Sequence, residues 1–401
     1  MSALEPSDAA GAGTGAGADG RAPGECDLPA GAWWAALAGL PGMGPARLGA
    51  LWEACAPEEA WRLVAEGGAH RLPTLATLLG KQAESVAAGL ARAAAAVDVA
   101  ERWAAHREAG IEVVVRGDPR MPPRLDDDID PPFVLFAAGD LTATEGPTIA
   151  IVGTRRCSRP GAEIAHEIGR QCARAGGRVV SGLAVGIDAA AHAGALAAGP
   201  GAAPPVAVVG SGLDVIYPAR SRALWHQVAR QGVVLSEYPL GTSPTRWRFP
   251  ARNRLVAALA DVVVVVESAR TGGSMYTVDE ALERQREVLA VPGSVRSTAS
   301  AGTNWLLSQG AHPCCSPEDV LMAAHLTATP EEAASVLDPR PPPTGDGRRV
   351  LRAIGWDPAT LDAVATRTGL GLGAVAVALD RLEADGWIDR ADGRIERRAR
   401  P

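Results

Sequence analysis

The central part of the chain, residues 147–295, alternates short apolar runs with longer stretches of mixed character. Near-continuous runs of Val, Ile and Leu are typical of strands that are covered on both faces. Stretches long enough for a crossover helix separate most of these runs, and this alternation predicts a right-handed, parallel α/β sheet. The pattern therefore predicts a doubly wound, mostly parallel, Rossmann-like domain, with strands at "TIAIVG", "RVVSG", "PVAVVGSG", "VVLSE", "DVVVVVE" and "VLAVPG".

Two apolar runs, "IEVVV" and "FVLFAAG", precede this domain and are separated by a proline-rich loop. We expect both to be strands of the same sheet, the second of them edge-like. Further upstream, a helical pattern from Trp33 to about Leu79 is followed by one longer predicted helix, Lys81 to Ala109. Within the first pattern, "LPGMGPARLGAL" predicts two short helices joined by a glycine hairpin. Such a hairpin can direct backbone N–H groups at a phosphate or act as a packing turn, and we favour packing because no lysine lies beside it.

The C-terminal part has a different pattern. A segment rich in proline and acidic residues, "ATPEEAASVLDPRPPPTGDG", predicts a linker. Three helical stretches and a strand–turn–strand, "WIDRADGRIERR", follow it. This order predicts a winged helix–turn–helix. Its third helix, "GLGAVAVALDRLEADG", carries few side chains that can read bases, so contact with a protein is at least as good an interpretation as contact with DNA.

These patterns predict five segments along the 401 residues. We expect a disordered Gly/Ala-rich leader at 1–28 and a helical domain of the helix-hairpin-helix or SAM-like type at 29–110. The Rossmann-like domain is expected at 111–325, the linker at 326–347 and the winged helix at 348–401.

Composition adds limits to the possible functions. Hydrophobic residues make up 47% of the chain and charged residues 21%, as in an ordinary globular protein. No apolar run approaches the roughly 20 residues that span a bilayer, and the N-terminus has no signal-peptide pattern. We therefore expect a cytoplasmic protein with no membrane partner. The six cysteines have no CxxC spacing, which argues against zinc ligation and a disulfide framework.

The net charge of −7 does not by itself indicate a nucleic-acid binder, but the arginines are unevenly distributed. Between Gly153 and Gly182 there are six arginines and two acidic residues. "YPARSRALWHQVARQG" holds three more, and "TSPTRWRFPARNR" another four, with no acidic residue in either stretch. A phosphate backbone responds to a local patch rather than to the total charge. Either a functional basic patch or a solvated arginine-rich surface fits this distribution.

The glycine-bearing turns after the predicted strands are candidate ligand sites, because ligands bind at the carboxyl ends of strands in such sheets. A dinucleotide fingerprint needs GxGxxG in the first turn and an acidic residue at the end of the next strand. "GTRRCS" lacks the glycines, the next strand ends in Ser181-Gly182, and the chain's single lysine, Lys81, lies too far away for a P-loop. No cofactor is therefore expected.

The sequence also gives little support for catalysis. Asp188 and His192 have an i, i+4 spacing that would suit a metal, but no third ligand is evident. Glu237 and Glu267 end buried strands and could act as general acids, although hydrogen bonding to loop N–H groups is the simpler interpretation. We expect no catalytic residue and no metal site.

A basic and polar set of residues remains, interleaved with the aromatic residues Tyr217, Trp247 and Phe249. Arginine forks, backbone N–H groups and stacking rings are what a protein uses to bind a single nucleic-acid strand. The candidate DNA-binding residues are Arg155, Ser158, Gly182, Arg220, Arg248, Arg252, Asn253, Arg254, Gly273 and Ser274.

These segments, in this order and spacing, resemble the DprA (Smf) family of DNA-processing proteins. The resemblance covers about residues 115–320. It is carried by "DPPFVLFAAG", "IAIVGTRRCSRPG", "SGLAVGIDAAAHAGAL", "GSGLDVIYP", "LSEYPLGTSPTRWRFPARNR", "TGGSMYTVDEAL", "VLAVPG" and "GTNWLLSQGA".

The resemblance implies a non-catalytic homodimer that binds single-stranded DNA, protects incoming strands and helps load the RecA recombinase. It implies that Arg155 and Ser158 contact DNA phosphates and that Gly182 and "FPARNR" belong to the same basic pocket. Where the family often has a basic residue after Tyr-Pro, this chain has Ala219, followed by Arg220. Two alternatives remain. One is a nucleotide-processing enzyme of the LOG type using Glu280, and the other is a nucleotide-sensing scaffold.

Overall fold

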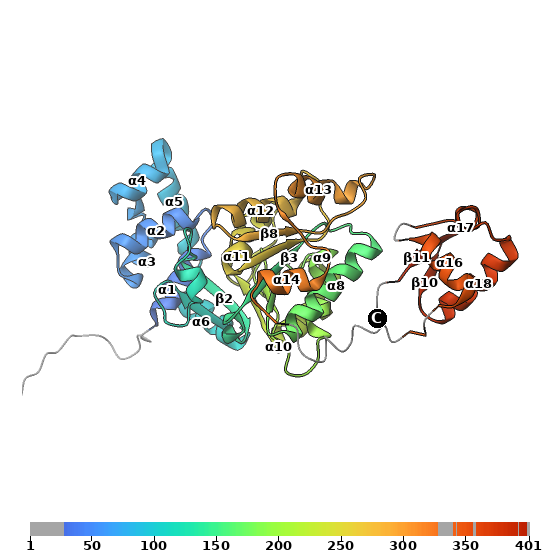
Figure 1. The fold of residues 1–401 in the computed structure, drawn as a ribbon. Helices are drawn as coiled ribbons and strands as arrows, with labels where there is room; N and C mark the ends of the chain where they lie inside the picture. Colours follow the sequence, from blue (N-terminus) through green and yellow to red (C-terminus); the bar gives the residue numbers. More distant parts are fainter. Residues whose placement is uncertain (1–27, 328–339, 342, 356–357, 392, 399–401) are drawn as a thin grey trace, which may run out of the picture.

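The structure is a computed structural model. It describes residues 28–327, 340–341, 343–355, 358–391 and 393–398. Nearly all of the predicted leader and much of the predicted linker lie outside these residues. Figure 1 shows a helical N-terminal part, a central α/β domain and a small C-terminal domain, in that order along the chain.

The N-terminal part consists of short helices that pack on one another and on the first strands of the sheet. The predicted single helix from Lys81 to Ala109 is wrong, because one helix ends at Ala94 and another starts after Asp98. The Asp98 carboxylate caps the second helix by accepting from the Glu101 N–H at 3.0 Å. The helices are α1 (Ala30–Ala38), α2 (Pro45–Ala54), α3 (Pro57–Ala65), α4 (Pro73–Leu79), α5 (Ala83–Ala94) and α6 (Val99–Glu108).

The central domain is built on one sheet of nine strands. They are β1 (Ile111–Val115), β2 (Val134–Gly139), β3 (Thr148–Val152), β4 (Arg178–Ser181), β5 (Val206–Val208), β6 (Val233–Ser236), β7 (Val262–Val265), β8 (Glu287–Ala290) and β9 (His312–Pro313). Their order is β1-β2-β6-β5-β4-β3-β7-β8-β9. The strands from β3 onward pair in parallel, whereas β2 is antiparallel to both β1 and β6. The expectation that β2 is edge-like is therefore wrong, since β1 occupies that edge.

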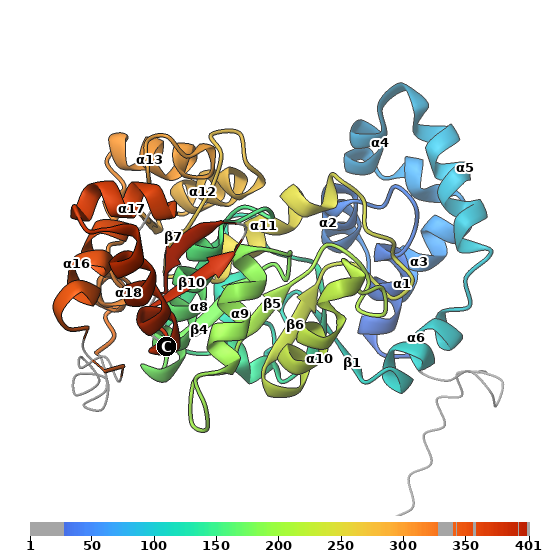
Figure 2. The same cartoon turned by 90° about the vertical axis from the view of Figure 1, so that its right-hand side faces the viewer.

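Helices cover both faces of this sheet, as Figures 1 and 2 show. They are α7 (Pro123–Asp126), α8 (Arg159–Arg174), α9 (Ile187–Leu196), α10 (Arg222–Gln231), α11 (Arg248–Leu259), α12 (Gly273–Glu283), α13 (Ala301–Ser308) and α14 (Pro317–Ala323). Alternate strand residues enter opposite cores. In β7, Val262 and Val264 pack with residues of α8, α9 and α14, whereas Val263 and Val265 pack with residues of α11, α12 and α13. This arrangement confirms the doubly wound α/β fold.

The C-terminal domain has its own core and the element order of a winged helix. A glycine in the left-handed region, Gly369, separates its second and third helices. Its elements are α16 (Gly345–Ile354), α17 (Leu361–Thr368), α18 (Leu372–Ala384), β10 (Ile388–Ala391) and β11 (Arg394–Arg397). Across the described residues, no single helix is long and apolar enough to span a membrane, although the bent pair α17 and α18 passes that test together.

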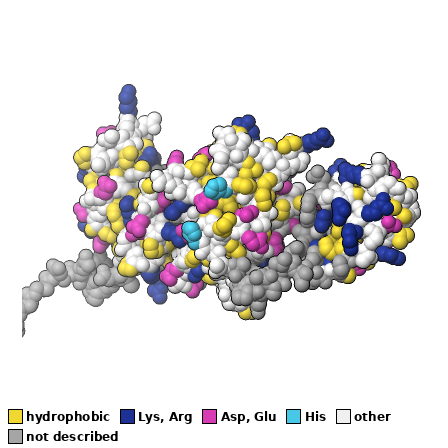
Figure 3. All heavy atoms as spheres, in the orientation of Figure 1, with side chains coloured by type: hydrophobic (Ala, Val, Ile, Leu, Met, Phe, Trp, Pro, Cys, Tyr) yellow, Lys and Arg dark blue, Asp and Glu magenta, His cyan; other side chains and the backbone are white. Residues whose placement is uncertain are grey.

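The surface charge is mixed on the face seen in Figure 1. Figure 3 shows basic and acidic side chains interspersed over the central domain, and basic side chains gathered on the C-terminal domain. On this face of the central domain, neither sign of charge dominates. The sheet topology indicates where to look, because β4 and β7 lie on opposite sides of β3 and the strand order reverses there. The carboxyl ends of strands at such a reversal form a crevice.

Candidate nucleic-acid interface

A cavity of about 670 Å³, here named the switch-point cavity, opens at this reversal. It lies between the turns that follow β3 and β4 and the N-terminal ends of α11 and α12. Its lining residues are Val152, Gly153, Thr154, Arg155, Arg156, Gly182, Ala184, Asp188, Tyr217, Arg246, Phe249, Pro250, Arg252, Asn253, Val256, Ala269, Gly272, Gly273, Ser274 and Thr277.

The turn after β3 forms one wall of the cavity. Gly153 is required there because a Cβ would lie 2.6 Å from the Ile187 side chain and 2.8 Å from the Glu267 carbonyl oxygen. This tight packing fixes the start of the turn, while the side chain of Arg155 stays exposed at the rim. The Arg155 guanidinium lies over the ring of Phe249, 4.9 Å from its centroid. The ring holds the cation at the mouth of the cavity without neutralising it.

The floor of the cavity is a close contact between Gly182 and Arg252. A Cβ at residue 182 would collide with both terminal nitrogens of the Arg252 guanidinium, so any other residue would displace this side chain. Arg252 is 5% exposed, its Nη1 donates to the Val208 carbonyl, and its Nε has no partner among the described residues. Burial lowers the pKa of Arg252 to about 10, partly opposed by Asp188, so the side chain remains a cation at neutral pH.

Asp188 lies behind this floor and is itself held by the backbone. Its Oδ2 accepts from the Gly182 N–H at 3.2 Å. Burial raises the pKa of Asp188, and the charge of Arg252 opposes that rise. Asp188 is the one acidic residue among the described residues that line the cavity, which also contains four arginines, so the cavity is strongly cationic.

The N-terminal end of α12 forms the opposite wall. The first N–H groups of a helix have no partner within the helix, and the helix dipole adds positive potential at this end. Gly273 and Ser274 present these groups to the cavity. The Asn253 amide donates to the Gly273 carbonyl at 3.3 Å, and the Ser274 hydroxyl donates to the Ser268 hydroxyl at 2.8 Å. The first contact ties α11 to α12, and the second ties α12 to the loop after β7, at the point where an anion would bind.

The structure brings six of the ten predicted site residues into this cavity. Arg220 is not among them; it lies exposed in the short turn Ala219–Ser221. Ser158 also lies beside the cavity rather than in its lining, because its hydroxyl caps α8 and donates to Glu267 at 2.6 Å. The six residues that line the cavity are Arg155, Gly182, Arg252, Asn253, Gly273 and Ser274.

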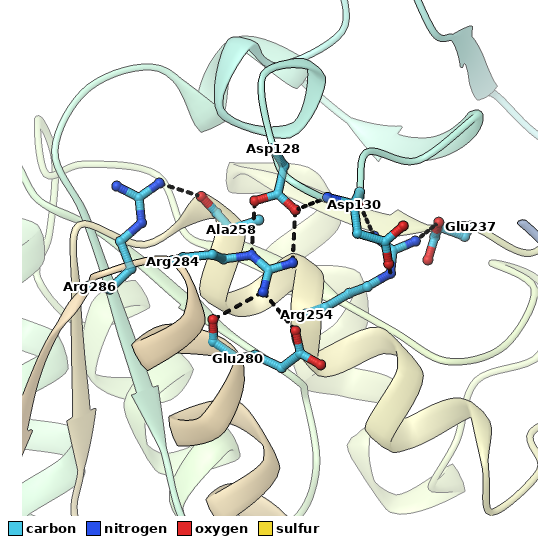
Figure 4. Close-up of polar contacts among 8 residues, drawn as sticks. All are labelled: Asp128, Asp130, Glu237, Arg254, Ala258, Glu280, Arg284 and Arg286. Carbon is cyan, nitrogen blue, oxygen red and sulfur yellow. Dashed lines mark hydrogen bonds and ion pairs between the residues drawn. The ribbon is translucent and has the colours of Figure 1, made fainter. Parts of the chain in front are cut away.

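Arg248 and Arg254 line a different cavity, of about 630 Å³, between the N-terminal helices and the central domain. We name it the interdomain cavity. Figure 4 shows the Arg254 side chain directed at Glu237 and Asp130, with which it forms ion pairs. Only two positions separate Arg252 from Arg254 on α11, so helical geometry turns them to different sides.

Two threonines in the lining, Thr154 and Thr277, were missed by the sequence-based prediction. Thr277 follows Gly273 by four positions, so helical periodicity places both on one face of α12 and could have identified it. Glu267 accepts from the Ser158 N–H at 2.8 Å. This is the hydrogen bond to a loop N–H group that the sequence analysis gave as the simpler interpretation of Glu267. Among the described residues, no group of three His, Cys, Asp or Glu side chains gathers as metal ligands do.

Glu280, the residue required by the nucleotide-processing alternative, does not line the switch-point cavity. Its carboxylate pairs with Arg284 at 2.7 Å. Arg284 in turn binds both carboxylate oxygens of Asp128 at 2.8 Å (Figure 4), with both side chains 3% exposed. Glu280 therefore belongs, as a partly exposed member, to an ion-pair network that joins α12 to the loop after α7.

Comparison with known proteins identifies the family. Residues 112–325 match the family model of DNA recombination-mediator protein A, and residues 329–394 match that of the DprA winged helix domain. DNA processing protein DprA of Bacillus subtilis is 38% identical over 218 residues, covering 54% of this chain and 72% of that protein. Protein Smf of Synechocystis is 32% identical over 330 residues, covering 73% and 82%.

The fold comparison agrees. The X-ray structure of DNA processing protein A from Streptococcus pneumoniae is 29% identical in sequence, with a TM-score of 0.60, and the match covers 74% of this chain and 98% of that one. The two family models together cover the central domain with its switch-point cavity and the winged helix. The chain therefore belongs to the DprA (Smf) family of DNA-processing, recombination-mediator proteins.

Proposed function

We propose that the chain binds single-stranded DNA in the switch-point cavity. In the cytoplasm it would protect incoming strands and help load the RecA recombinase during natural transformation or recombination. One observation carries the binding proposal. Four arginines and the N-terminal end of α12 surround a concave site whose single acidic lining residue, Asp188, is buried and hydrogen-bonded. Such a site favours an anion that brings several negative charges in a row.

The chemistry of the lining suits the phosphates of a phosphodiester strand. Guanidinium groups and helix N-termini match phosphate oxygens in geometry as well as in charge. Arg252 is fixed by burial against Gly182, so it loses little conformational freedom when an anion binds. Arg155 at the rim remains exposed and can adjust to the path of the strand.

Aromatic rings at the mouth favour an unpaired strand over a duplex. The Tyr217 and Phe249 rings lie 5.6 Å apart, and Tyr217 is 49% exposed. Exposed rings stack on unpaired bases regardless of sequence, whereas paired bases are enclosed in the duplex and cannot reach them. We therefore propose binding that depends weakly on sequence and strongly on strandedness.

We also propose that this binding is non-catalytic. Asp188, which lines the cavity, and Glu267, which holds the turn after β3, each accept from a backbone N–H group. Neither is placed as a free general acid or base facing the cavity. We further propose, from family membership, that the chain is a homodimer and that the RecA recombinase is its partner. Sedimentation tests the dimer, since the protein in solution should have twice the mass of one chain. The RecA partner is tested by measuring RecA filament formation on strands coated with single-strand-binding protein, with and without this protein.

The binding proposal is tested by titration of salt. Fluorescence anisotropy of a labelled oligo-dT and of a duplex of equal length is measured from ~50 to ~400 mM salt, a range in which phosphate contacts weaken steeply. We expect tighter binding of the single strand and a loss of affinity as salt rises. Absence of single-strand binding at the lowest salt would refute the proposal. Saturable binding of a mononucleotide with no gain from longer strands would instead favour a nucleotide sensor.

A further inference from the structure

The first turns of α11 separate the switch-point cavity from the interdomain cavity. The interdomain cavity lies between the turn that joins α1 to α2 and the loop 237–247. Both cavities therefore share the segment 246–254 as a common wall.

Residues of this shared segment line one cavity or the other, depending on their position along the helix. Helix positions three or four apart lie on one face, so a helix between two cavities divides its side chains between them. Toward the switch-point cavity lie Arg246, Phe249, Arg252 and Asn253, and toward the interdomain cavity lie Trp247, Arg248, Ala251 and Arg254. The two cavities therefore lie on different sides of one short segment of the chain.

The loop side of the interdomain cavity presents aromatic rings and a guanidinium. Trp247 is 62% exposed and meets the Tyr238 ring edge-on, with centroids 6.4 Å apart. The Arg248 guanidinium lies 4.7 Å from the Tyr238 centroid and 5.1 Å from that of Trp247. Its Nε is buried and has no hydrogen-bond partner within the described part of the chain. Its Nη1 donates to the Ser243 carbonyl, which holds the guanidinium in the cavity wall. A flat ligand with acceptor atoms can stack on the Trp247 ring and accept from the guanidinium N–H groups that line the cavity.

The remaining walls disfavour a phosphate in the same place. Glu237 lines the cavity and its carboxylate pairs with Arg254, so this wall carries no net positive charge (Figure 4). On the opposite side, the cavity is lined by apolar side chains, among them Leu40 and Met43 of the α1–α2 turn. Burial raises the pKa of Tyr238 to about 12, so its ring remains neutral. The cavity is therefore apolar and aromatic where the switch-point cavity is cationic.

We propose that the interdomain cavity is a nucleobase subsite. It accepts an unpaired base of the same DNA strand whose phosphates occupy the switch-point cavity, stacked on Trp247 and hydrogen-bonded by Arg248. The inference rests on the proposed function. In this arrangement the N-terminal helical domain takes part in binding DNA, because the α1–α2 turn forms one side of the interdomain cavity.

The test separates base binding from phosphate binding. Affinities of the full chain are measured for oligo-dT and for a strand of equal length that carries only abasic tetrahydrofuran residues. Trp247→Ala is compared with wild type and with Tyr276→Ala, a matched control whose ring is also exposed, on α12, but lines neither cavity. Loss of one stacked base weakens binding by about 5- to 150-fold. We expect that loss for Trp247→Ala on oligo-dT, less than about twofold on the abasic strand, and recovery with Trp247→Phe.

Each other outcome contradicts the subsite. Equal losses on both strands would mean that Trp247 supports phosphate binding or the fold, and no loss on oligo-dT would leave the cavity to another occupant, such as an apolar peptide. If the wild type binds neither strand, the proposed function itself fails, which is a distinct result. Photocrosslinking with 5-iododeoxyuridine gives a second readout. We expect adducts on Trp247 or Tyr238, and adducts confined to Tyr217 and Phe249 would overturn the proposal.

Discussion

Arg155→Ala removes one of the four arginines that line the switch-point cavity. For single strands, each phosphate contact contributes about 0.7 to the slope of log K against log salt, so four contacts give a slope of about −2.8. The variant is expected to reduce that slope by about 0.7 in magnitude. A hydrogen bond to a charged group contributes about 1.5–3 kcal/mol, so affinity at low salt should fall about 10- to 150-fold.

The assay is anisotropy of labelled oligo-dT over a series of salt concentrations, fitted separately for each variant. Arg230→Ala is the matched control, because Arg230 is also an exposed arginine, lies in the last turn of α10 and lines neither cavity. The control should keep the wild-type slope. Arg155 is exposed, so its replacement should leave the melting temperature within a few degrees. An unchanged slope for Arg155→Ala, or an equal reduction for the control, would show that the cavity does not hold the phosphates.

Three further changes test the architecture of the site. Gly182→Ala places a Cβ against the Arg252 guanidinium, and we expect at least a tenfold loss of oligo-dT affinity with a folded circular dichroism spectrum; unchanged affinity would show that the contact is dispensable. Asp128→Ala leaves the buried Arg284 without its bidentate partner and should lower the free energy of unfolding by about 3 kcal/mol in urea titrations, whereas a neutral effect would mean that Glu280 alone compensates. Burial lowers the pKa of His192 to about 4, below the unfolded value near 6.5. The neutral side chain therefore contributes to the free energy of unfolding above pH 6.5, and this contribution is lost as the pH falls toward 4. Wild type should therefore lose about 3 kcal/mol more than His192→Gln between those two pH values, and parallel curves would contradict this.

The strands of the central domain could be predicted because continuous Val and Ile runs are specific for a sheet covered on both faces. The misassignment of β2 as edge-like was avoidable in part, since "VLFAAG" is also apolar at consecutive positions and is buried along almost its whole length. Its pairing with β6, about 100 positions later, is set by tertiary packing and leaves no local signal. The start of a new helix at Val99 could have been predicted from the sequence, because Asp98 and Glu101 have the spacing of an N-terminal capping pair.

The candidate site was predictable as a set of residue types but not as an arrangement. Gly182 and Arg252 are 70 positions apart, and their contact depends on how α11 crosses the end of β4. Arg254 was grouped with Arg252 because the resemblance assigns the whole segment "FPARNR" to one basic pocket. The segment is helical from Arg248, with Pro250 in the first turn where no N–H is needed. Because the segment is helical, two residues that are two positions apart point to different sides, so Arg252 and Arg254 line different cavities.

The central claim is that single-stranded DNA occupies the switch-point cavity, and amide hydrogen exchange tests it most directly. Exchange is followed by mass spectrometry for the full chain alone, with oligo-dT, and with a duplex of equal length. The account predicts slower exchange in peptides that cover Gly153–Arg156 and Gly272–Thr277, the two walls with backbone groups at the cavity, when the single strand is added. Protection confined to the winged helix, or protection of these walls by the duplex alone, would contradict it.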